Sequence, residues 1–391
     1  MSSYFDPLCK SIPVAPLKLA TTEGCRDFAT KVNDTLVQYR HTNPSHAADN
    51  IACKGYSENS YLIDCSCPRF GSGEGKGILH ESVRGTDLYI FSDITNYSVT
   101  YKVCGMTNYM SPDNHFQDIK RLISASDGKA KRLNVIMPFL YEGRQHKRSG
   151  RESLDCALAL QELVNMGVTN ILTFDAHDPR VQNAVPLISF DTFMPTYQFL
   201  KAILECTPDF KIDPDHLMII SPDEGAMSRA VYFSTILGVD MGMFYKRRDY
   251  STIVNGKNPI VAHEFLGDSV EGKDVLIVDD MISSGESMLD VAKQLKDRHA
   301  KRVIICTTFG LFTDGFDKFD DFYNKGYIDH LITTNLNYRD PIIFSKPYYK
   351  EADMTGFMAS IIDCLNHDVS SAKIISPTAK IQKLLAKLQT K

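Results

Sequence analysis

The sequence has no run of about 18 apolar residues, the length at which a segment becomes a candidate for a membrane-spanning helix. Its first twenty residues, MSSYFDPLCKSIPVAPLKLA, contain no uninterrupted apolar core of the kind found in signal peptides. The ten cysteines follow no framework spacing, so we expect reduced, mostly buried thiols instead of disulfides. These absences predict a cytoplasmic protein without a membrane partner.

The sequence also lacks a large excess of either charge, since 43 basic residues stand against 48 acidic ones and the net charge is −5. Bulk charge therefore gives no reason to expect a nucleic-acid partner. Any binding of phosphate has to come from local clusters of basic residues. At 391 residues the chain is long enough for two domains.

Short apolar runs alternate along the chain with segments of helical spacing. The expected strands are 17–20, 88–91, 133–140, 170–174, 216–221, 241–245, 275–278 and 302–308. The expected helices are 21–39, 117–125, 152–166, 196–206, 226–237 and the segment after 287. This alternation predicts an α/β fold with parallel sheets flanked by helices. In open sheets of this type, ligands bind beyond the carboxyl ends of the strands.

A proline-containing loop near 185–191 separates two such halves. We therefore expect an N-terminal domain over 1–188, a C-terminal domain over 189–350 and a helical tail over 351–391. The polar, turn-rich segment 41–60 is expected to be an insertion or a long loop.

The stretch 275–289, VLIVDDMISSGESML, carries the strongest chemical signal. Its first four residues predict a buried strand, an acidic pair follows, and a turn with hydroxyls and glycine opens a segment of helical spacing. The N–H groups of a first helical turn and the helix dipole attract anions, so we expect a phosphate here. The two carboxylates would hold the hydroxyls of a sugar that carries this phosphate. The candidate residues are Asp279, Asp280, Ser283, Ser284, Gly285, Glu286 and Ser287.

An ordinary strand, hydrophilic turn and helix would have the same local pattern. The stretch nevertheless resembles the phosphoribosyl-pyrophosphate loop of the type I phosphoribosyltransferase fold. In that family an acidic pair after a strand grips the ribose hydroxyls, and a Thr/Ser-Gly loop takes the 5-phosphate. The resemblance implies that the seven candidate residues bind ribose 5-phosphate.

Five further segments resemble the ribose-phosphate pyrophosphokinase family, roughly over residues 65–345. They are RFGSGE with ESVRG (69–85), RQHKR (144–148), DAH (175–177), SPDEG (221–225) and KRR (246–248). That family transfers the diphosphoryl group of ATP to O1 of ribose 5-phosphate and releases AMP. The resemblance implies two tandem phosphoribosyltransferase-like domains, with MgATP and ribose 5-phosphate as ligands.

The resemblance implies that the first domain supplies much of the ATP side. Phe70 and Glu74 match residues that reach the adenine of a neighbouring subunit's ATP. Arg144 and Gln145 match a polyphosphate motif, in keeping with the forked bonds that arginine makes to phosphate. His177 matches a residue that contacts the ATP phosphates and Mg²⁺.

The remaining matches concern the metal and the transferred group. Asp223 matches a residue that lies on Mg²⁺, a hard ion that prefers oxygen ligands. Lys246 and Arg248 match a cationic loop, and with His177 they are the expected catalytic residues. Taken alone, these segments have structural interpretations: a solvated basic turn, a helix-capping aspartate and a structural histidine.

Several positions depart from the family pattern. Ser72 and His146 stand where the family has aspartate, and Ser283 replaces the aspartate that usually precedes the phosphate loop. Glu286 stands where the family prefers glycine and brings a negative charge next to the expected phosphate. These changes indicate a divergent branch of the family.

Two other functions stay open on the sequence. The chain could be a phosphoribosyltransferase that consumes phosphoribosyl pyrophosphate, or a non-catalytic paralogue that regulates a synthetase. The basic cluster at 144–148 and the segment 246–248 favour the synthetase over the transferase. The resemblance also implies a homo-oligomer, often a hexamer built from dimers.

Overall fold

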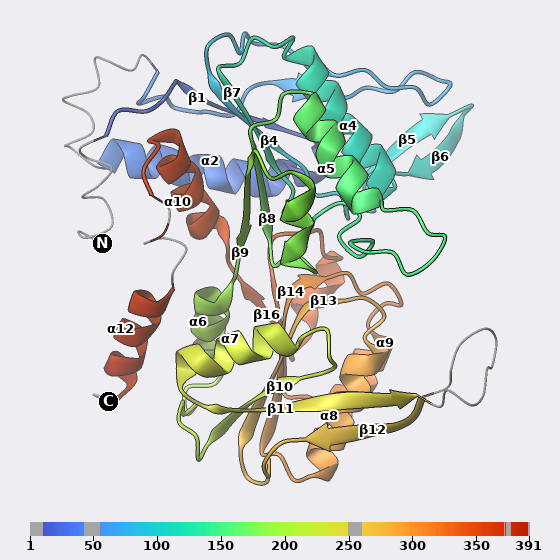
Figure 1. Ribbon diagram of the computed structural model, residues 1–391, viewed down its shortest axis with the longest axis vertical. Coiled ribbons are helices and arrows are strands. Elements are labelled where there is room, and N and C mark those ends of the chain that lie inside the picture. Colours follow the sequence, from blue (N-terminus) through green and yellow to red (C-terminus); the bar gives the residue numbers. More distant parts are fainter. Residues whose placement is uncertain (1–10, 43–54, 249–259, 371, 373–376, 390–391) are drawn as a thin grey trace. The chain divides into compact units, whose positions relative to one another are not determined.

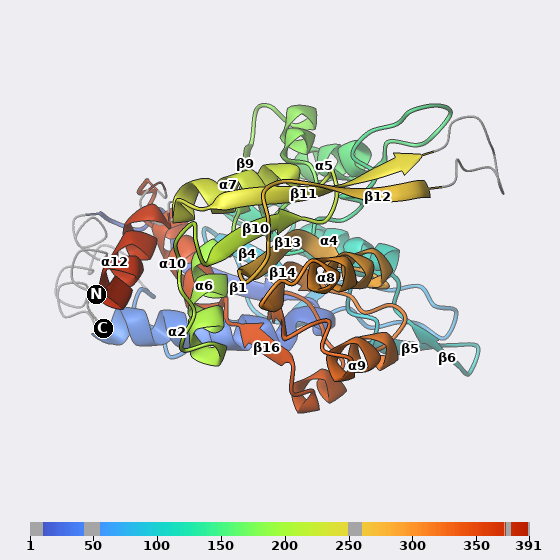
Figure 2. The same cartoon turned by 90° about the horizontal axis from the view of Figure 1, so that it is seen from below.

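Two separate sheets form the framework of the chain in the computed structural model, which describes residues 11–42, 55–248, 260–370, 372 and 377–389 (Figures 1 and 2). Each sheet belongs to its own structural unit. The first unit contains Met1–Met194, Asn335–Tyr338 and Asp353–Ser376, and the second contains Pro195–Thr334, Arg339–Ala352 and Pro377–Lys391. None of the described helices is both long and apolar enough to cross a membrane.

Five parallel strands form the sheet of the first unit, in the order β1-β4-β7-β8-β9. They are β1 (Leu17–Thr21), β4 (Asp87–Phe91), β7 (Arg132–Ile136), β8 (Asn170–Phe174) and β9 (Ser189–Phe193). Every residue of β4 is buried, as expected for a strand in the middle of a parallel sheet whose two faces are covered.

The first unit also contains helices and two small antiparallel pairs. The helices are η2 (Glu23–Cys25), α2 (Arg26–Thr42), α4 (Pro112–Ala125), α5 (Asp155–Asn165), η4 (Pro179–Ala184) and α10 (Thr355–Asn366). The strand pairs are β2 (Cys65–Ser66) with β3 (Ile78–Leu79), and β5 (Thr100–Val103) with β6 (Met106–Tyr109). Helix α10 comes from the far end of the chain and lies beside α2 (Figure 1).

Seven strands form the sheet of the second unit, in the order β12-β11-β10-β13-β14-β15-β16. They are β10 (Leu217–Ser221), β11 (Asp240–Arg248), β12 (Ile260–Leu266), β13 (Asp274–Ile282), β14 (Arg302–Gly310), β15 (His330–Thr334) and β16 (Tyr349–Ala352). All neighbours are parallel except β11 and β12, which pair antiparallel. The helices are α6 (Thr196–Cys206), α7 (Met227–Leu237), α8 (Glu286–Asp297), α9 (Asp317–Asn324), η5 (Pro341–Ser345) and α12 (Thr378–Gln389).

Strand β13 shows how this sheet is covered on both faces. Val275 and Ile277 belong to the apolar cluster that contains the buried residues of α8. Leu276 and Val278 belong to a second cluster, which contains residues of α6 and α7. Because successive side chains of a strand point to opposite faces, the unbroken run 275–278 fills both cores at once.

A pair of a buried aspartate and a partly buried arginine joins the first residues of two neighbouring strands in each unit. In the first unit, Arg132 donates Nε to Asp87 Oδ1 at 2.8 Å and Nη2 to Oδ2 at 2.6 Å. In the second unit, Arg302 makes the same two bonds to Asp274 at 2.7 and 2.6 Å. In both units the paired residues lie opposite one another in the strand register. The two units thus share this local pairing, although their strand orders differ.

The predicted fold class is confirmed, since both halves are α/β with parallel sheets and helices. Strand β8 and helix α6 have the predicted bounds. We expected strands 241–245 and 275–278 to stop before their polar residues, but β11 continues to Arg248 and β13 to Ile282. The longer strands are paired throughout, β11 with the antiparallel β12 and β13 with β14.

The division of the chain differs from the expected ranges. The first unit extends to Met194 instead of residue 188, because β9 still pairs with β8. The segment 351–391, expected as one tail, is shared between the two units. Most of the expected insertion, residues 43–54, lies outside the described residues.

Within the first unit, a buried arginine connects α2 to α10. Arg40 on α2 is 1% exposed and donates to Asp363 Oδ1 at 2.9 Å and to Asn366 Oδ1 at 2.8 Å. Its guanidinium also lies over the rings of Tyr56 and Tyr61, at 4.5 and 4.9 Å. Planar stacking and forked bonds of this kind suit arginine.

We expect Arg40→Met to lower the free energy of unfolding by about 3–5 kcal/mol, because it leaves the Asp363 carboxylate buried without its cation. Urea unfolding followed by circular dichroism measures this change. The matched control is Arg26→Met, since Arg26 forms a mostly exposed pair with Glu23 and should contribute less than about 1 kcal/mol. Equal effects of the two substitutions would contradict the assigned role of Arg40.

Candidate active site

The loop after β13 has the backbone geometry of an anion site. Gly285 immediately precedes α8 with φ +84°, and an added Cβ would lie 2.3 Å from the ring of Phe319. Glycine tolerates this left-handed conformation, and the Phe319 ring leaves no room for a side chain. Glu286, Ser287 and Met288 begin the helix, so their N–H groups have no acceptor within it. Those groups and the positive end of the helix dipole favour an anion.

The side chain of Glu286 turns outward. It is 69% exposed, and its Oε1 accepts a bond from Lys318 Nζ of α9 at 2.6 Å. The bond and charge of Glu286 raise the pKa of Lys318, which keeps the lysine protonated beside it. The carboxylate that departs from the family pattern is therefore paired with a cation of the neighbouring helix, while its backbone N–H stays in the first turn of α8.

The two acidic residues that precede the loop have different surroundings. Asp280 is 3% exposed, whereas Asp279 is partly buried and accepts the N–H of Asp280 at 2.8 Å. Burial, and then the charge of Asp280, raise the pKa of Asp279 well above its usual range. Ser283 and Ser284 are also partly buried, and Ser287 is exposed.

Arg229 is a residue of this site that the sequence analysis missed. It lies on α7 and places Nη2 3.5 Å from Asp280 Oδ2, and both side chains are buried. The available signal was an arginine among the apolar residues of a predicted helix, four positions after Gly225. That signal does not identify the partner, because Asp280 lies about fifty residues further along the chain, on strand β13.

Asp223 lies in the turn between β10 and α7. Its Oδ1 accepts the N–H groups of Gly225 at 2.9 Å and Ala226 at 3.3 Å, so the carboxylate caps the start of the helical segment. The alternative interpretation of Asp223 as a helix-capping residue is therefore correct for Oδ1. Among the described residues, no group of three or more His, Cys, Asp or Glu side chains is arranged to hold a metal.

In the first unit, His177 follows strand β8 at a strained turn. Asp175 has φ +39°, and the N–H of Ala176 donates to Thr192 Oγ1 at 3.0 Å. Non-glycine residues adopt such a φ at an energetic penalty and are concentrated at functional sites. The strain supports a functional role for this turn.

His146, which replaces an aspartate of the family pattern, lies against His177. The two ring centroids are 5.3 Å apart, and His146 Nε2 is 3.5 Å from Asp178 Oδ2. Bonds from Arg180 hold the pKa of Asp178 down to about 2, so this carboxylate is ionised at neutral pH. His146 Nδ1 is buried and has no hydrogen-bond partner among the residues that the structure describes.

The other candidates of the ATP side lie in exposed loops. Arg144 is exposed, and Gln145 Nε2 donates to the carbonyls of Lys147 at 3.1 Å and Ser153 at 2.8 Å. The Gln145 side chain therefore shapes its own loop.

Phe70 and Glu74 face each other across a tight turn. The Phe70 N–H donates to the Glu74 carbonyl at 2.7 Å, and the Phe70 ring is 55% exposed. Ser72, at the position of a family aspartate, donates its hydroxyl to Glu74 at 2.8 Å. Phe70 also borders a cavity of about 490 Å³ that includes Cys65 and Tyr101.

Lys246 and Arg248 lie in β11, which pairs with β12. The polar segment that follows them, residues 249–259, lies outside the described residues. The expected catalytic roles of these two residues stay predictions.

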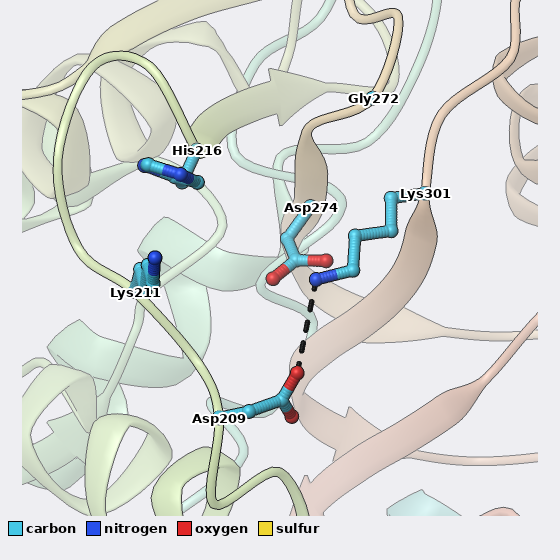
Figure 3. A pocket seen from close by; sticks show the side chains of 6 residues that line it. All are labelled: Asp209, Lys211, His216, Gly272, Asp274 and Lys301. Atoms are coloured by element: carbon cyan, nitrogen blue, oxygen red, sulfur yellow. Dashed lines mark ion pairs between the residues drawn. The ribbon is translucent and has the colours of Figure 1, made fainter.

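A second pocket lies at the opposite end of β13 (Figure 3). It has a volume of about 330 Å³ and is lined by Asp209, Lys211, His216, Gly272, Asp274 and Lys301. Asp209 pairs there with Lys301 at 3.7 Å. Asp274 and Asp279 are about 16 Å apart along the strand at about 3.3 Å per residue. This pocket is therefore separate from the phosphate loop, at the strand end where ligands of open α/β sheets do not usually bind.

Two family models match the chain in tandem. The N-terminal domain of ribose phosphate pyrophosphokinase matches residues 17–167, and the phosphoribosyl transferase domain matches residues 201–325. This order confirms the predicted pair of phosphoribosyltransferase-like domains.

Individual relatives agree with the family models. The ribose-phosphate pyrophosphokinase of Mycoplasma pneumoniae is 29% identical over 268 residues, covering 68% of this chain and 74% of the relative. That of Pasteurella multocida is 28% identical over 325 residues, covering 81% and 93%. The solved phosphoribosylpyrophosphate synthetase of Mycobacterium smegmatis has a TM-score of 0.68 at 20% identity over 90% of this chain and 99% of that one, which shows a shared fold.

We expect Gly285→Ala to lower the free energy of unfolding by about 1–3 kcal/mol through backbone strain, and further through displacement of the Phe319 ring. Urea unfolding measures the loss. Gly315→Ala is the matched control, because Gly315 has φ +75° but an added Cβ there would meet nothing within 4 Å. If Gly285→Ala were no more destabilising than this control, the close packing of Phe319 would have no energetic role.

Proposed function

We propose that this chain, which belongs to the ribose-phosphate pyrophosphokinase family, transfers the diphosphoryl group of MgATP to O1 of ribose 5-phosphate and so forms phosphoribosyl pyrophosphate and AMP. The observation that carries the proposal is the loop of the second unit, where a strand ending in two acidic residues leads through a left-handed glycine into α8. Donors for a phosphate and acceptors for sugar hydroxyls thus lie within one short segment.

The loop residues bind ribose 5-phosphate in this proposal. The 5-phosphate accepts bonds from the first N–H groups of α8 and from the hydroxyls of Ser283, Ser284 and Ser287. Asp279 accepts from a ribose hydroxyl. The pairing of Glu286 with Lys318 supports this assignment, because it partly neutralises the acidic side chain at the start of α8.

The first unit supplies most of the ATP ligands in this proposal. Arg144, Gln145 and His177 bind the polyphosphate, and Phe70 and Glu74 bind adenine of a neighbouring subunit's ATP. The exposed ring of Phe70 on a hydrogen-bonded turn supports the adenine contact, since a stacking residue has to be both accessible and held. The strained turn at Asp175 supports the role of His177.

The reaction needs positioning and charge neutralisation more than covalent chemistry. The sugar O1 attacks the β-phosphorus, a new O–P bond forms, and the bond from that phosphorus to the α,β-bridging oxygen breaks. AMP leaves with that oxygen, and the hydroxyl proton passes to solvent. In this proposal Lys246 and Arg248 stabilise the negative charge that grows on the phosphates in the transition state.

Magnesium is expected to arrive with ATP, and Asp223 and His177 are the residues that would contact it. The Asp223 carboxylate fits a hard cation, because it supplies oxygen ligands and the backbone N–H groups of the turn fix its orientation through Oδ1. When bound, the ion neutralises part of the polyphosphate charge. The cytoplasmic location and the specificity for ATP are part of the same proposal.

We expect purified protein to form AMP from MgATP only when ribose 5-phosphate is present. Lys246→Ala should lower kcat by about 10²–10³-fold, because it removes a cation that acts in the transition state. Lys325→Ala, which removes a surface lysine paired with Asp321, is the control and should have unchanged activity. Chromatographic measurement of AMP gives both results.

The same assay distinguishes the other functions. Well-folded protein that formed no AMP over a range of phosphate concentrations would not be a synthetase. Pyrophosphate release from phosphoribosyl pyrophosphate and a base would then identify a transferase, and inactivity in both assays would favour a regulatory paralogue. Full activity of Lys246→Ala would contradict the proposed mechanism.

We also propose that the chain forms homo-oligomers built from dimers. The β5–β6 hairpin supports this proposal, because Met106 is 65% and Tyr109 69% exposed. Sedimentation velocity should show a dimer or a larger assembly, and Met106→Lys with Tyr109→Lys should shift it toward monomer by placing charges in an apolar contact. A fully active wild-type monomer would contradict the proposal.

A further inference from the structure

Arg229 is a buried cation next to the acidic pair. It is 6% exposed, and its Nη2 lies 3.5 Å from Asp280 Oδ2. Asp280 is similarly buried, at 3%. Replacement of a buried ion pair by apolar residues is often neutral for stability, so the pair is weak evidence of a purely stabilising role.

The same guanidinium reaches a second segment. Arg229 Nη1 donates to the carbonyl of Gly225 at 3.5 Å, in the turn where Asp223 caps the start of α7. That turn follows β10, and Asp280 lies near the end of β13, the neighbouring strand of the sheet. Arg229 therefore connects the turn expected to contact magnesium with the strand end expected to hold the sugar.

The positive charge of Arg229 offsets the mutual repulsion of the Asp279, Asp280 and Asp223 carboxylates. Burial and the charges of Asp280 and Asp223 raise the pKa of Asp279, whereas the charge of Arg229 lowers it. Without Arg229, the neighbouring charges that act on Asp279 would be those of Asp280 and Asp223, which are both negative. Such a site favours rearrangement or protonation of the acidic pair.

We propose that Arg229 is a positioning residue for ribose 5-phosphate, which holds Asp280 and so fixes the acidic pair at the end of β13 for the sugar hydroxyls. This inference rests on the proposed function and assigns the position of the pair to a helix that the phosphate does not touch. The contact of Arg229 with Asp280 and the bond from the Asp280 N–H to Asp279 Oδ1 support it, because together they connect both carboxylates to α7.

The chain offers a matched control for this role. Arg302, a partly buried residue of β14, pairs with the buried Asp274 at the start of strand β13, far from the loop, and also with the exposed Asp209. Arg229→Met and Arg302→Met thus make the same chemical change and each leave one buried aspartate of β13 without its arginine. A general loss of stability affects both variants, whereas a loss of sugar positioning affects only the first.

We expect Arg229→Met to raise KM for ribose 5-phosphate by about tenfold while kcat and KM for ATP change by less than about threefold. Arg229→Lys should have an intermediate KM, about threefold above wild type, because lysine keeps the charge without the planar fork. Arg302→Met should lower the unfolding temperature and leave KM within about twofold of wild type. If Arg229→Met fails to fold, the KM of Arg229→Lys for ribose 5-phosphate decides whether the inference holds.

An unchanged KM in the Arg229 variants, or an equal rise in Arg302→Met, would overturn the inference. Calorimetric titration with ribose 5-phosphate in the absence of ATP measures sugar binding alone. It therefore tests the role of Arg229 separately from the proposed function. If wild type forms no AMP but Arg229→Met alone weakens ribose 5-phosphate binding, the proposed function fails and the inference stands. If wild type neither forms AMP nor binds ribose 5-phosphate, both are contradicted.

Discussion

Pairs of a buried aspartate and a partly buried arginine, at the first residues of neighbouring strands, fix the register on which the loops depend. Asp87 with Arg132 and Asp274 with Arg302 make the same two bonds in the two units. A slip of one residue would unpair two buried charges and turn every side chain of the strand to the opposite face. Because Asp274 is held in this way, the carboxylates at 279 and 280 emerge at a defined position beside α7 and α8. The two units therefore share this pairing, although the sheet of the second unit has two more strands and a different strand order.

The phosphate loop accommodates its departures from the family pattern through neighbouring helices. Phe319 of α9 packs against Gly285, and Lys318 of the same helix pairs with Glu286. One helix therefore both restricts the loop backbone and takes up its extra charge. On the other side, Arg229 of α7 pairs with Asp280. The loop alone would bring three acidic side chains close to a bound phosphate, and its surroundings supply a cation for two of them.

Local pattern predicted the elements well where an apolar run is bounded by polar turns, as in β8 and α6. It failed where polar residues continue a strand, as at Asp279–Ile282 in β13, because pairing with β14 decides the end of that strand. The return of α10 to the first unit depends on partners far away in sequence, such as Arg40 with Asp363. For the same reason the candidate loop residues could be named from the sequence, but Arg229 and Lys318 could not. Their roles arise from contacts between different helices and strands.

The central claim is that an intact diphosphoryl group moves from ATP to the sugar. Phosphorus nuclear magnetic resonance of a mixture of the protein, MgATP and ribose 5-phosphate tests it most directly, because it identifies every phosphorus-containing product. Attack at the β-phosphorus predicts AMP and phosphoribosyl pyrophosphate in equal amounts, with the diphosphate attached at C1 of the ribose. Formation of ADP with a singly phosphorylated C1, or of free phosphate from ATP, would contradict the account.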